Sequence, residues 1–137
     1  MKHLKLFESV SESDFDDVKD IFQDIVDEYD IYKISMHSGA QTLSSGLYYA
    51  YKFITGNASY NKSNSFRIEI YLINESKRLG LRINETQFDE DINKLKHDLE
   101  NFKNRITQIG FDVEFRNELN CEMLLSGVDI IIRLNAF

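Results

Sequence analysis

The chain has 137 residues, a common size for one domain and too short for two ordinary ones. Its hydrophobic content of 42% supports a core without disulfides or metal and argues against a disordered chain. The net charge is −7, and the basic residues are scattered rather than clustered. Nucleic acid and anionic membranes are therefore not expected as partners, because binding phosphates requires a basic surface.

The cysteine content and the hydropathy indicate the cellular compartment. Cys121 is the single cysteine, so no internal disulfide can form, which fits a reducing compartment. No apolar run approaches the roughly 18 residues that span a membrane, and the opening segment is too short and charged for a secretory signal. We therefore expect an intracellular protein.

The first predicted element is a helix from about Asp14 to Tyr29. Ser11 or Ser13 precedes it as a candidate N-cap, and aspartates occupy its first turn, at the positive end of the helix dipole. Apolar residues recur at helical spacing and form a single stripe that should face the core. They are Phe15, Val18, Ile21, Phe22, Ile25, Val26 and Tyr29.

Strand-like segments follow this helix. Residues 31–37 and 66–73 alternate apolar and polar side chains, which is typical of a sheet with one packed face. Residues 47–54 are apolar on both parities, which favours a central or doubly covered strand. Residues 79–83 follow a polar turn and are candidates to close a hairpin with 66–73. In residues 31–37 the packed face should carry Tyr32, Ile34 and Met36. In residues 66–73 it should carry Phe66, Ile68, Ile70 and Leu72.

A second helix is predicted from about Gln87 to Ile109, because its apolar residues alternate spacings of three and four. Gly110 is placed to end it in a left-handed conformation. The alternating segment 111–116 and the apolar segment 128–134 follow as strands. Between them we expect at most one short helical turn, around Cys121–Leu125.

This order of elements predicts an α+β fold, a two-layer sandwich in which both helices pack on one face of an antiparallel or mixed sheet. If Lys2–Phe7 is itself a strand, the order approaches the ferredoxin-like βαββαβ plan. We expect residues 1–10 to be an N-terminal leader or an edge strand, and residues 11–137 to form a single α+β domain. The expected core comprises Ile21, Ile25, Ile68, Ile70, Leu95, Leu99, Phe102, Val113 and Ile132.

No motif predicts catalysis, a cofactor or a metal site. Cys121 lies among apolar residues and is interpreted as a packed side chain, and no two histidines have metal-ligand spacing. Residues 46–53 resemble the aromatic strand on which RNA-binding RRM domains stack bases. Because these aromatics fall on both faces, we interpret them as core and cross-strand packing. An enzyme of unrecognised class is the alternative, and it requires a pocket gathering several of His37, Glu69, Arg67 and Cys121.

Acidic residues crowd the first helix. Asp17, Asp20, Asp24 and Asp27 recur three or four residues apart, where like charges repel one another. Two interpretations stay open. The four form either a solvated face that keeps the protein soluble, or a docking face for a basic protein partner or divalent cations.

The opening of the chain reads MKHLKLFE. It resembles the short K-x-F-E opening of many small, mostly uncharacterised proteins of marine tailed phages. It also resembles the head-targeting leaders of large contractile-tailed phages, in which a protease cuts after the Glu of a Leu/Ile-x-Glu motif. Leu6, Phe7 and Glu8 fit that motif, as do residues 73–75 and 83–85.

The resemblance implies a non-enzymatic phage accessory or virion-associated protein that acts through protein contacts, in the host cytoplasm or the virion. Tail-terminator proteins of phages resemble the chain in size, acidity and predicted element order: a helix, three strands, a second helix and two strands. That second resemblance implies a head–tail completion component that forms a ring.

Overall fold

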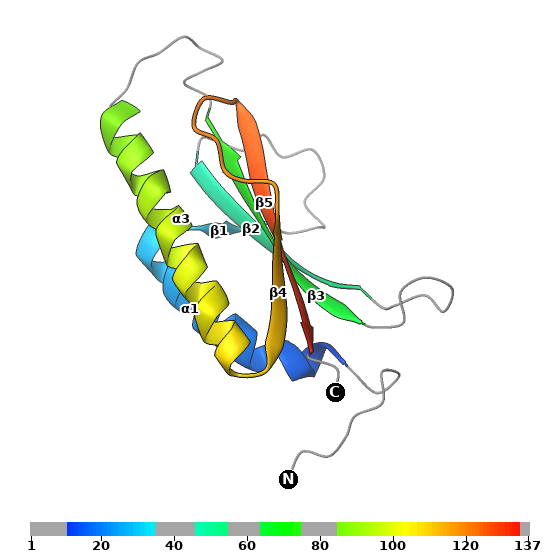
Figure 1. Ribbon diagram of the computed structural model, residues 1–137. Coiled ribbons are helices and arrows are strands. Elements are labelled where there is room, and N and C mark those ends of the chain that lie inside the picture. Colours follow the sequence, from blue (N-terminus) through cyan, green and yellow to red (C-terminus); the bar gives the residue numbers. More distant parts are fainter. Residues whose placement is uncertain (1–10, 35–45, 55–63, 75–84, 135–137) are drawn as a thin grey trace.

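In the computed structural model, two helices lie against one face of a five-stranded sheet (Figure 1). This confirms the predicted two-layer α+β sandwich. The structure describes residues 11–34, 46–54, 64–74 and 85–134, without the side chains of 85–88. The elements are the 3₁₀ helix η2 (Glu12–Phe15), α1 (Asp16–Tyr29), β1 (Tyr32–Lys33), β2 (Gly46–Ile54), β3 (Ser65–Ile73), α3 (Glu85–Gln108), β4 (Phe111–Arg116) and β5 (Leu125–Leu134).

The strands lie in the order β1-β2-β3-β5-β4. The pairing of β1 with β2 is parallel and the other pairings are antiparallel, so the sheet is mixed. Both edges of β3 are occupied, one by β2 and the other by β5. The predicted hairpin between 66–73 and 79–83 is therefore wrong, because β3 has no free edge for a further strand; its hairpin partner is β2. Residues 79–83 themselves lie outside the described part.

The ends of the helices follow from local hydrogen bonds. The Ser11 N–H donates to the Asp14 carboxylate at 2.8 Å, and the Asp14 N–H donates to the Ser11 carbonyl at 3.1 Å, which fixes the first turn. After α3, Gly110 has a φ of 103° and its N–H donates to the Thr107 carbonyl at 3.2 Å, which confirms its predicted role. None of the described helices is long and apolar enough to cross a membrane.

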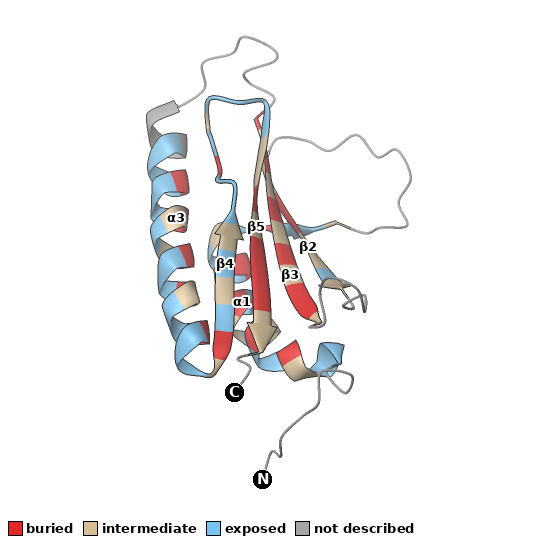
Figure 2. Cartoon of the chain, turned by 45° about the vertical axis from the view of Figure 1, so that its right-hand side comes forward, coloured by how far each residue is buried: buried red, intermediate tan, exposed pale blue. Residues whose placement is uncertain are grey.

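The core lies between the helices and the sheet, where Figure 2 shows the buried faces of α3, β3 and β5. Phe15 stacks on Phe66 with ring centroids 5.4 Å apart, and Phe22 meets Phe102 edge-on at 5.6 Å. Most of the predicted core is confirmed as buried, namely Ile25, Ile68, Ile70, Leu95, Leu99, Phe102 and Ile132.

Two core predictions are wrong, because Ile21 and Val113 are only partly buried. Ile21 lies at the border of the helix layer, where it lines a groove between α1 and α3. Val113 lies on β4, an edge strand with one paired neighbour. Both positions have the right periodicity, but periodicity does not show how completely a neighbouring element covers a side chain.

The packed face predicted for residues 31–37 is wrong at Tyr32, within the described part of that segment, residues 31–34. Tyr32 is 62% exposed and pairs with Tyr48, whereas the Lys33 ammonium lies 5.7 Å from the centre of the Tyr51 ring on the helix side. β1 is a two-residue edge strand, too short for its apolar residues to require the core face. The next residue, Ile34, is partly buried, and its N–H donates to the Tyr49 carbonyl at 2.9 Å.

Several predictions fall on residues outside the described part. They are the leader or edge strand of residues 1–10, the Leu6-Phe7-Glu8 motif, the ferredoxin-like first strand and the positions of Met36 and His37. They remain predictions.

Candidate functional site

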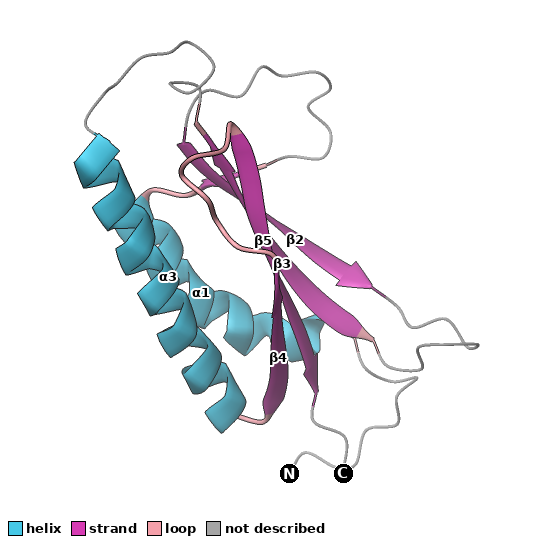
Figure 3. Ribbon diagram, turned by 45° about the horizontal axis from the view of Figure 1, so that its top comes forward, coloured by secondary structure: helices cyan, strands magenta, loops and turns pink. Residues whose placement is uncertain are grey.

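Both described helices lie on the same side of the sheet, and no helix among the described residues covers its other face (Figure 3). We call this the helix-free face. Residues two apart in a strand share a face, so the buried Phe66 and Ile68 of β3 define the core side. The alternate residues of β3 point the other way, and strand register assigns their neighbours on β2 and β5. These β3 residues are Arg67, Glu69, Tyr71 and Ile73.

Three tyrosines form one row across the helix-free face. Tyr32 pairs in register with Tyr48, and Tyr48 pairs with Tyr71. The rings of Tyr32 and Tyr48 lie 6.0 Å apart, with Tyr48 buried, Tyr71 half-buried and Tyr32 exposed. We call them the tyrosine row. Tyrosine combines a large rigid apolar surface with a polar tip, which is why it is enriched in protein interfaces.

An exposed apolar turn, Met123–Leu125, adjoins the tyrosine row. Its three side chains are 52%, 43% and 57% exposed in chain order. Leu125 pairs with Ile73, one row beyond the pair of Tyr71 with Gly127, so the turn continues the same face. A contiguous exposed apolar patch on a folded domain often marks a binding surface.

The apolar turn is held by hydrogen bonds. The backbone N–H of buried Asn74 donates to the Leu124 carbonyl at 2.8 Å, and its side-chain amide donates to the Cys121 carbonyl at 2.9 Å. The Asn120 N–H donates to Ser126 Oγ at 2.9 Å. The predicted helical turn around Cys121–Leu125 is wrong. The Cys121 and Leu124 carbonyls accept hydrogen bonds from Asn74 instead of from N–H groups within a helix, and β5 begins at Leu125.

Charged rows border the tyrosine row on its other side. Glu69 is paired with the Lys52 ammonium at 3.6 Å and also accepts a hydrogen bond from the Tyr71 hydroxyl. Burial, followed by this bond to Glu69, raises the pKa of Tyr71 to about 12. Further along the face, Glu114 is contacted by Arg116 at 3.3 Å and by Arg133 at 3.9 Å.

Arg67 differs from these charged neighbours. It lies directly opposite Lys52, a second cation, in the β2–β3 register. Its Nε is buried and has no hydrogen-bond partner. Within the described residues, no carboxylate lies within ion-pair distance of Arg67. A buried N–H without an acceptor is costly for the folded domain.

The predicted acidic docking face lies on the helix layer. Asp17, Asp20, Asp24 and Asp27 are all exposed, on a stripe of α1 opposite its apolar stripe. Asp27 accepts a hydrogen bond from the Gln23 amide at 2.9 Å. The nearby Lys19 pairs with Glu12 at 3.2 Å and with Asp16 at 4.0 Å, so among the described residues no ion pair neutralises the four. Their docking role remains a prediction.

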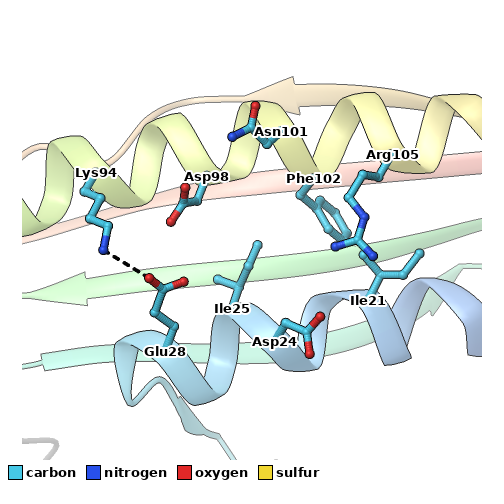
Figure 4. A pocket seen from close by; sticks show the side chains of 9 residues that line it. All are labelled: Ile21, Asp24, Ile25, Glu28, Lys94, Asp98, Asn101, Phe102 and Arg105. Carbon is cyan, nitrogen blue, oxygen red and sulfur yellow. Dashed lines mark hydrogen bonds and ion pairs between the residues drawn. The ribbon is translucent and has the colours of Figure 1, made fainter.

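A shallow groove of about 250 Å³ runs between α1 and α3 (Figure 4). Its floor is apolar, with Ile25 and Phe102, and the ion pair between Lys94 and Glu28 at 3.1 Å closes one end. Asp24 and Arg105 flank the other end (Figure 4). The lining holds no cysteine or histidine, and we interpret the groove as the crevice between two packed helices.

Of the residues considered for an enzyme, the described Cys121 and Glu69 do not share one pocket. Burial, followed by a hydrogen bond with Asp89, raises the pKa of the Cys121 thiol, which disfavours the reactive thiolate. Glu69 is five residues along β3 from Asn74, the contact of Cys121, a separation of about 16 Å. His37 lies outside the described residues. Where the structure describes side chains, it holds no group of three or more metal-ligating residues.

Comparison with protein-family models, curated proteins and solved structures finds no match to this chain. The function is therefore inferred from its own residues. Reasoning from the sequence found the acidic stripe, which lies on one helix, but missed the tyrosine row and the apolar turn. The row joins residues from three strands, and only the register of those strands brings them together.

Proposed function

We propose that this chain is a non-enzymatic protein-binding domain whose binding surface is the helix-free face. The observation that carries the proposal is the tyrosine row continuing into the exposed apolar turn. Tyrosine and methionine are over-represented at the centres of protein interfaces. Because Asn74 already fixes the turn, a partner pays little ordering entropy when it docks there.

We also propose a biological setting, namely an accessory or virion-associated protein of a tailed phage, in the host cytoplasm or the virion. The support is the MKHLKLFE opening, which resembles the opening of such proteins. Binding other proteins is compatible with the net charge of −7, which disfavours nucleic acid as the ligand.

A ring-forming tail-terminator or head–tail completion component is the second candidate function. The order of the described elements favours it, since α1 is followed among them by three strands, α3 and two closing strands. Fold resemblance alone does not assign a function, so the subunit count is the deciding measurement. In light scattering, a hexamer would support this candidate and a monomer at all concentrations would contradict it.

The binding surface can be tested once a partner has been captured on the immobilised chain and purified. The partner is titrated calorimetrically against the native chain and the variants Tyr32→Ser and Leu125→Ser. Both side chains are exposed, so the fold should survive. We expect each variant to weaken binding by about tenfold or more, as for residues central to an interface.

The matched controls are Asp17→Asn and Asp24→Asn, exposed changes on the opposite layer. If the helix-free face binds the partner, these variants should leave the dissociation constant unchanged. The reverse pattern, with loss only in the aspartate variants, would assign docking to the acidic stripe and contradict the proposal.

A further inference from the structure

We propose that β4 pairs with the β4 strand of a second copy of this chain, so that two sheets join into one continuous sheet. β4 forms one edge of the sheet, and among the described residues β5 is its single neighbouring strand (Figure 1). Alternate residues of such a strand direct their N–H and C=O groups outward, where another strand can bind them. The inference goes beyond the proposed function, because it concerns the edge of the sheet rather than the helix-free face.

The β4 edge lacks the features by which proteins usually prevent pairing with another chain. These features are proline, lysine, bulges, inward-pointing charges and very short edge strands. Residues 111–116 read FDVEFR, and their register with β5 is continuous from Phe111 to Arg116. The opposite edge strand, β1, has two residues. β4 is therefore the edge that a second strand can extend.

The apolar side chains on the helix side of β4 are incompletely covered. Val113 and Phe115 are partly buried, whereas Ile130 and Ile132, their neighbours on β5, are fully buried. Paired strands are about 4.8 Å apart and packed helices about 8–10 Å, so two copies fit only if α3 lies inward of β4. The partial exposure of this edge agrees with that position of α3. An added strand would bury the remaining apolar surface, which favours association.

Face and charge together select one register for the pairing. Residues directly opposite in an antiparallel pair share a face, so even-numbered residues must meet even-numbered ones. Asn117 has a φ of 64°, which ends the extended run at Arg116. Two registers then pair five residues of each copy. The register centred on Val113 places Asp112 opposite Glu114, which is repulsive, whereas the register centred on Glu114 places Asp112 opposite Arg116.

The register centred on Glu114 is complementary along its length. Asp112 and Arg116 are exposed, and the twofold axis forms their pair twice. On the helix side, Val113 lies opposite Phe115 of the second copy, a favourable cross-strand pair. Glu114 meets its own counterpart on the axis. Arg116 and Arg133 contact each Glu114 carboxylate at 3.3 Å and 3.9 Å, which offsets the repulsion between the two.

This pairing would make the binding surface bivalent. Because each residue keeps its face, the helix-free faces of the two copies lie on the same side of the joined sheet. Five strand spacings separate the two β3 strands, which places them about 24 Å apart. A partner with two suitable segments would then engage both tyrosine rows, and the second contact would form at a high effective concentration.

The test is sedimentation velocity of the full chain from about 10 µM to 1 mM, because an interface of this size is expected to be transient. We expect the mass to rise from monomer to dimer. Asp112→Arg and Arg116→Asp should each weaken dimerisation by about tenfold or more, since two attractive pairs become two repulsive ones. The matched control Asp24→Arg, exposed on α1, makes the same change of charge as Asp112→Arg and should dimerise as the native chain does.

An equimolar mixture of Asp112→Arg and Arg116→Asp gives the sharpest result. In the mixed dimer, the arginines of one variant lie opposite the aspartates of the other, so both pairs are attractive again. We expect the mixture to dimerise where neither variant does alone. Both positions are exposed, so both variants should stay folded. A mixture that dimerises no better than its components would contradict the register and overturn the inference.

Amide hydrogen exchange shows whether β4 itself forms the contact. The outward N–H groups of β4 should exchange more slowly as the concentration rises. If they are already protected at the lowest concentration, another segment of the chain covers this edge and the inference is wrong. A monomer at about 1 mM, or a dimer lost only in Tyr32→Ser, would also overturn it. The proposed function is tested separately, because capture of a partner on the helix-free face does not require β4 to pair.

Discussion

The ring of Tyr71 lies over Gly127, its pairing partner on β5. A Cβ at position 127 would stand 3.5 Å from Tyr71 Cδ1 and 3.0 Å from the Ile70 carbonyl oxygen. Because Gly127 has no side chain, the Tyr71 ring can lie against β5 at this position. Glycine inside a strand often marks such a close approach.

Replacing Gly127 with alanine should therefore destabilise the protein. The change lowers the entropy of the unfolded chain, which favours folding by about 0.4–1 kcal/mol. Overpacking against a backbone carbonyl typically costs about 1–3 kcal/mol, and a carbonyl in a paired strand has little room to move. We expect a net loss of about 1 kcal/mol in urea unfolding, with Glu100→Ala on the α3 surface as the control. A gain in stability would show that β3 and β5 can separate at this point.

Leu99→Ala should lower the free energy of unfolding by about 2–5 kcal/mol, because Leu99 is buried and its removal leaves a cavity in the core. Ile109→Ala is the matched control, since that side chain lies just after α3 and is half exposed. It should cost well under about 1 kcal/mol. Equal losses in urea unfolding of the two variants would contradict the assigned core face of α3.

The helices and their buried stripes could be predicted because helical periodicity is local information. The alternation in Phe66–Leu72 of β3 also predicted the buried face of that strand. Its apolar residues Phe66, Ile68, Ile70 and Leu72 are all buried in the core. The face of Tyr32 could not be predicted, because a two-residue strand carries no pattern. The candidate site could not be predicted from the sequence either, because only strand register brings Tyr32, Tyr48 and Tyr71 into one row.

Asn74→Ala tests whether the apolar turn is preorganised. The substitution removes the amide that donates to the Cys121 carbonyl and leaves that carbonyl without its partner. We expect a loss of about 1–3 kcal/mol in stability, together with faster hydrogen exchange at Met123. The control Asn104→Ala, exposed on α3, should change neither quantity. Unchanged exchange at the turn in Asn74→Ala would show that Asn120 and Ser126 hold it without Asn74.

The pKa of Tyr71 predicts a loss of stability at high pH. Its folded pKa of about 12 lies above the ordinary value of 10.0, so the folded state holds the proton more tightly than the unfolded chain. The corresponding stability is fully present below pH 10 and is lost as the pH rises towards 12. Tyr71→Phe should therefore show a shallower decline than the native chain over that range in urea unfolding.

Only the difference between the two proteins reports on Tyr71, because burial also raises the pKa values of Tyr29, Tyr49 and Tyr51. At neutral pH, Tyr71→Phe should be less stable than the native chain, since it lacks the hydrogen bond to Glu69. Parallel declines above pH 10 would mean that Tyr71 titrates alike in both states.

The acidic stripe of α1 should cost stability rather than supply it. Asp20 lies three residues after Asp17 and four before Asp24, and each such like-charge pair costs a few tenths of a kcal/mol. Asp20→Asn should therefore raise the free energy of unfolding by about 0.5 kcal/mol at low salt, and the gain should shrink as salt screens the charges. Glu100→Gln on α3 is the opposite control, because Glu100 has the opposite charges Lys96 four residues before it and Lys103 three residues after it. This substitution should lower the free energy of unfolding rather than raise it. If millimolar calcium raises the Tm of the native chain but not of Asp20→Asn, beyond sodium at equal ionic strength, the stripe binds cations and is not merely a solvated face.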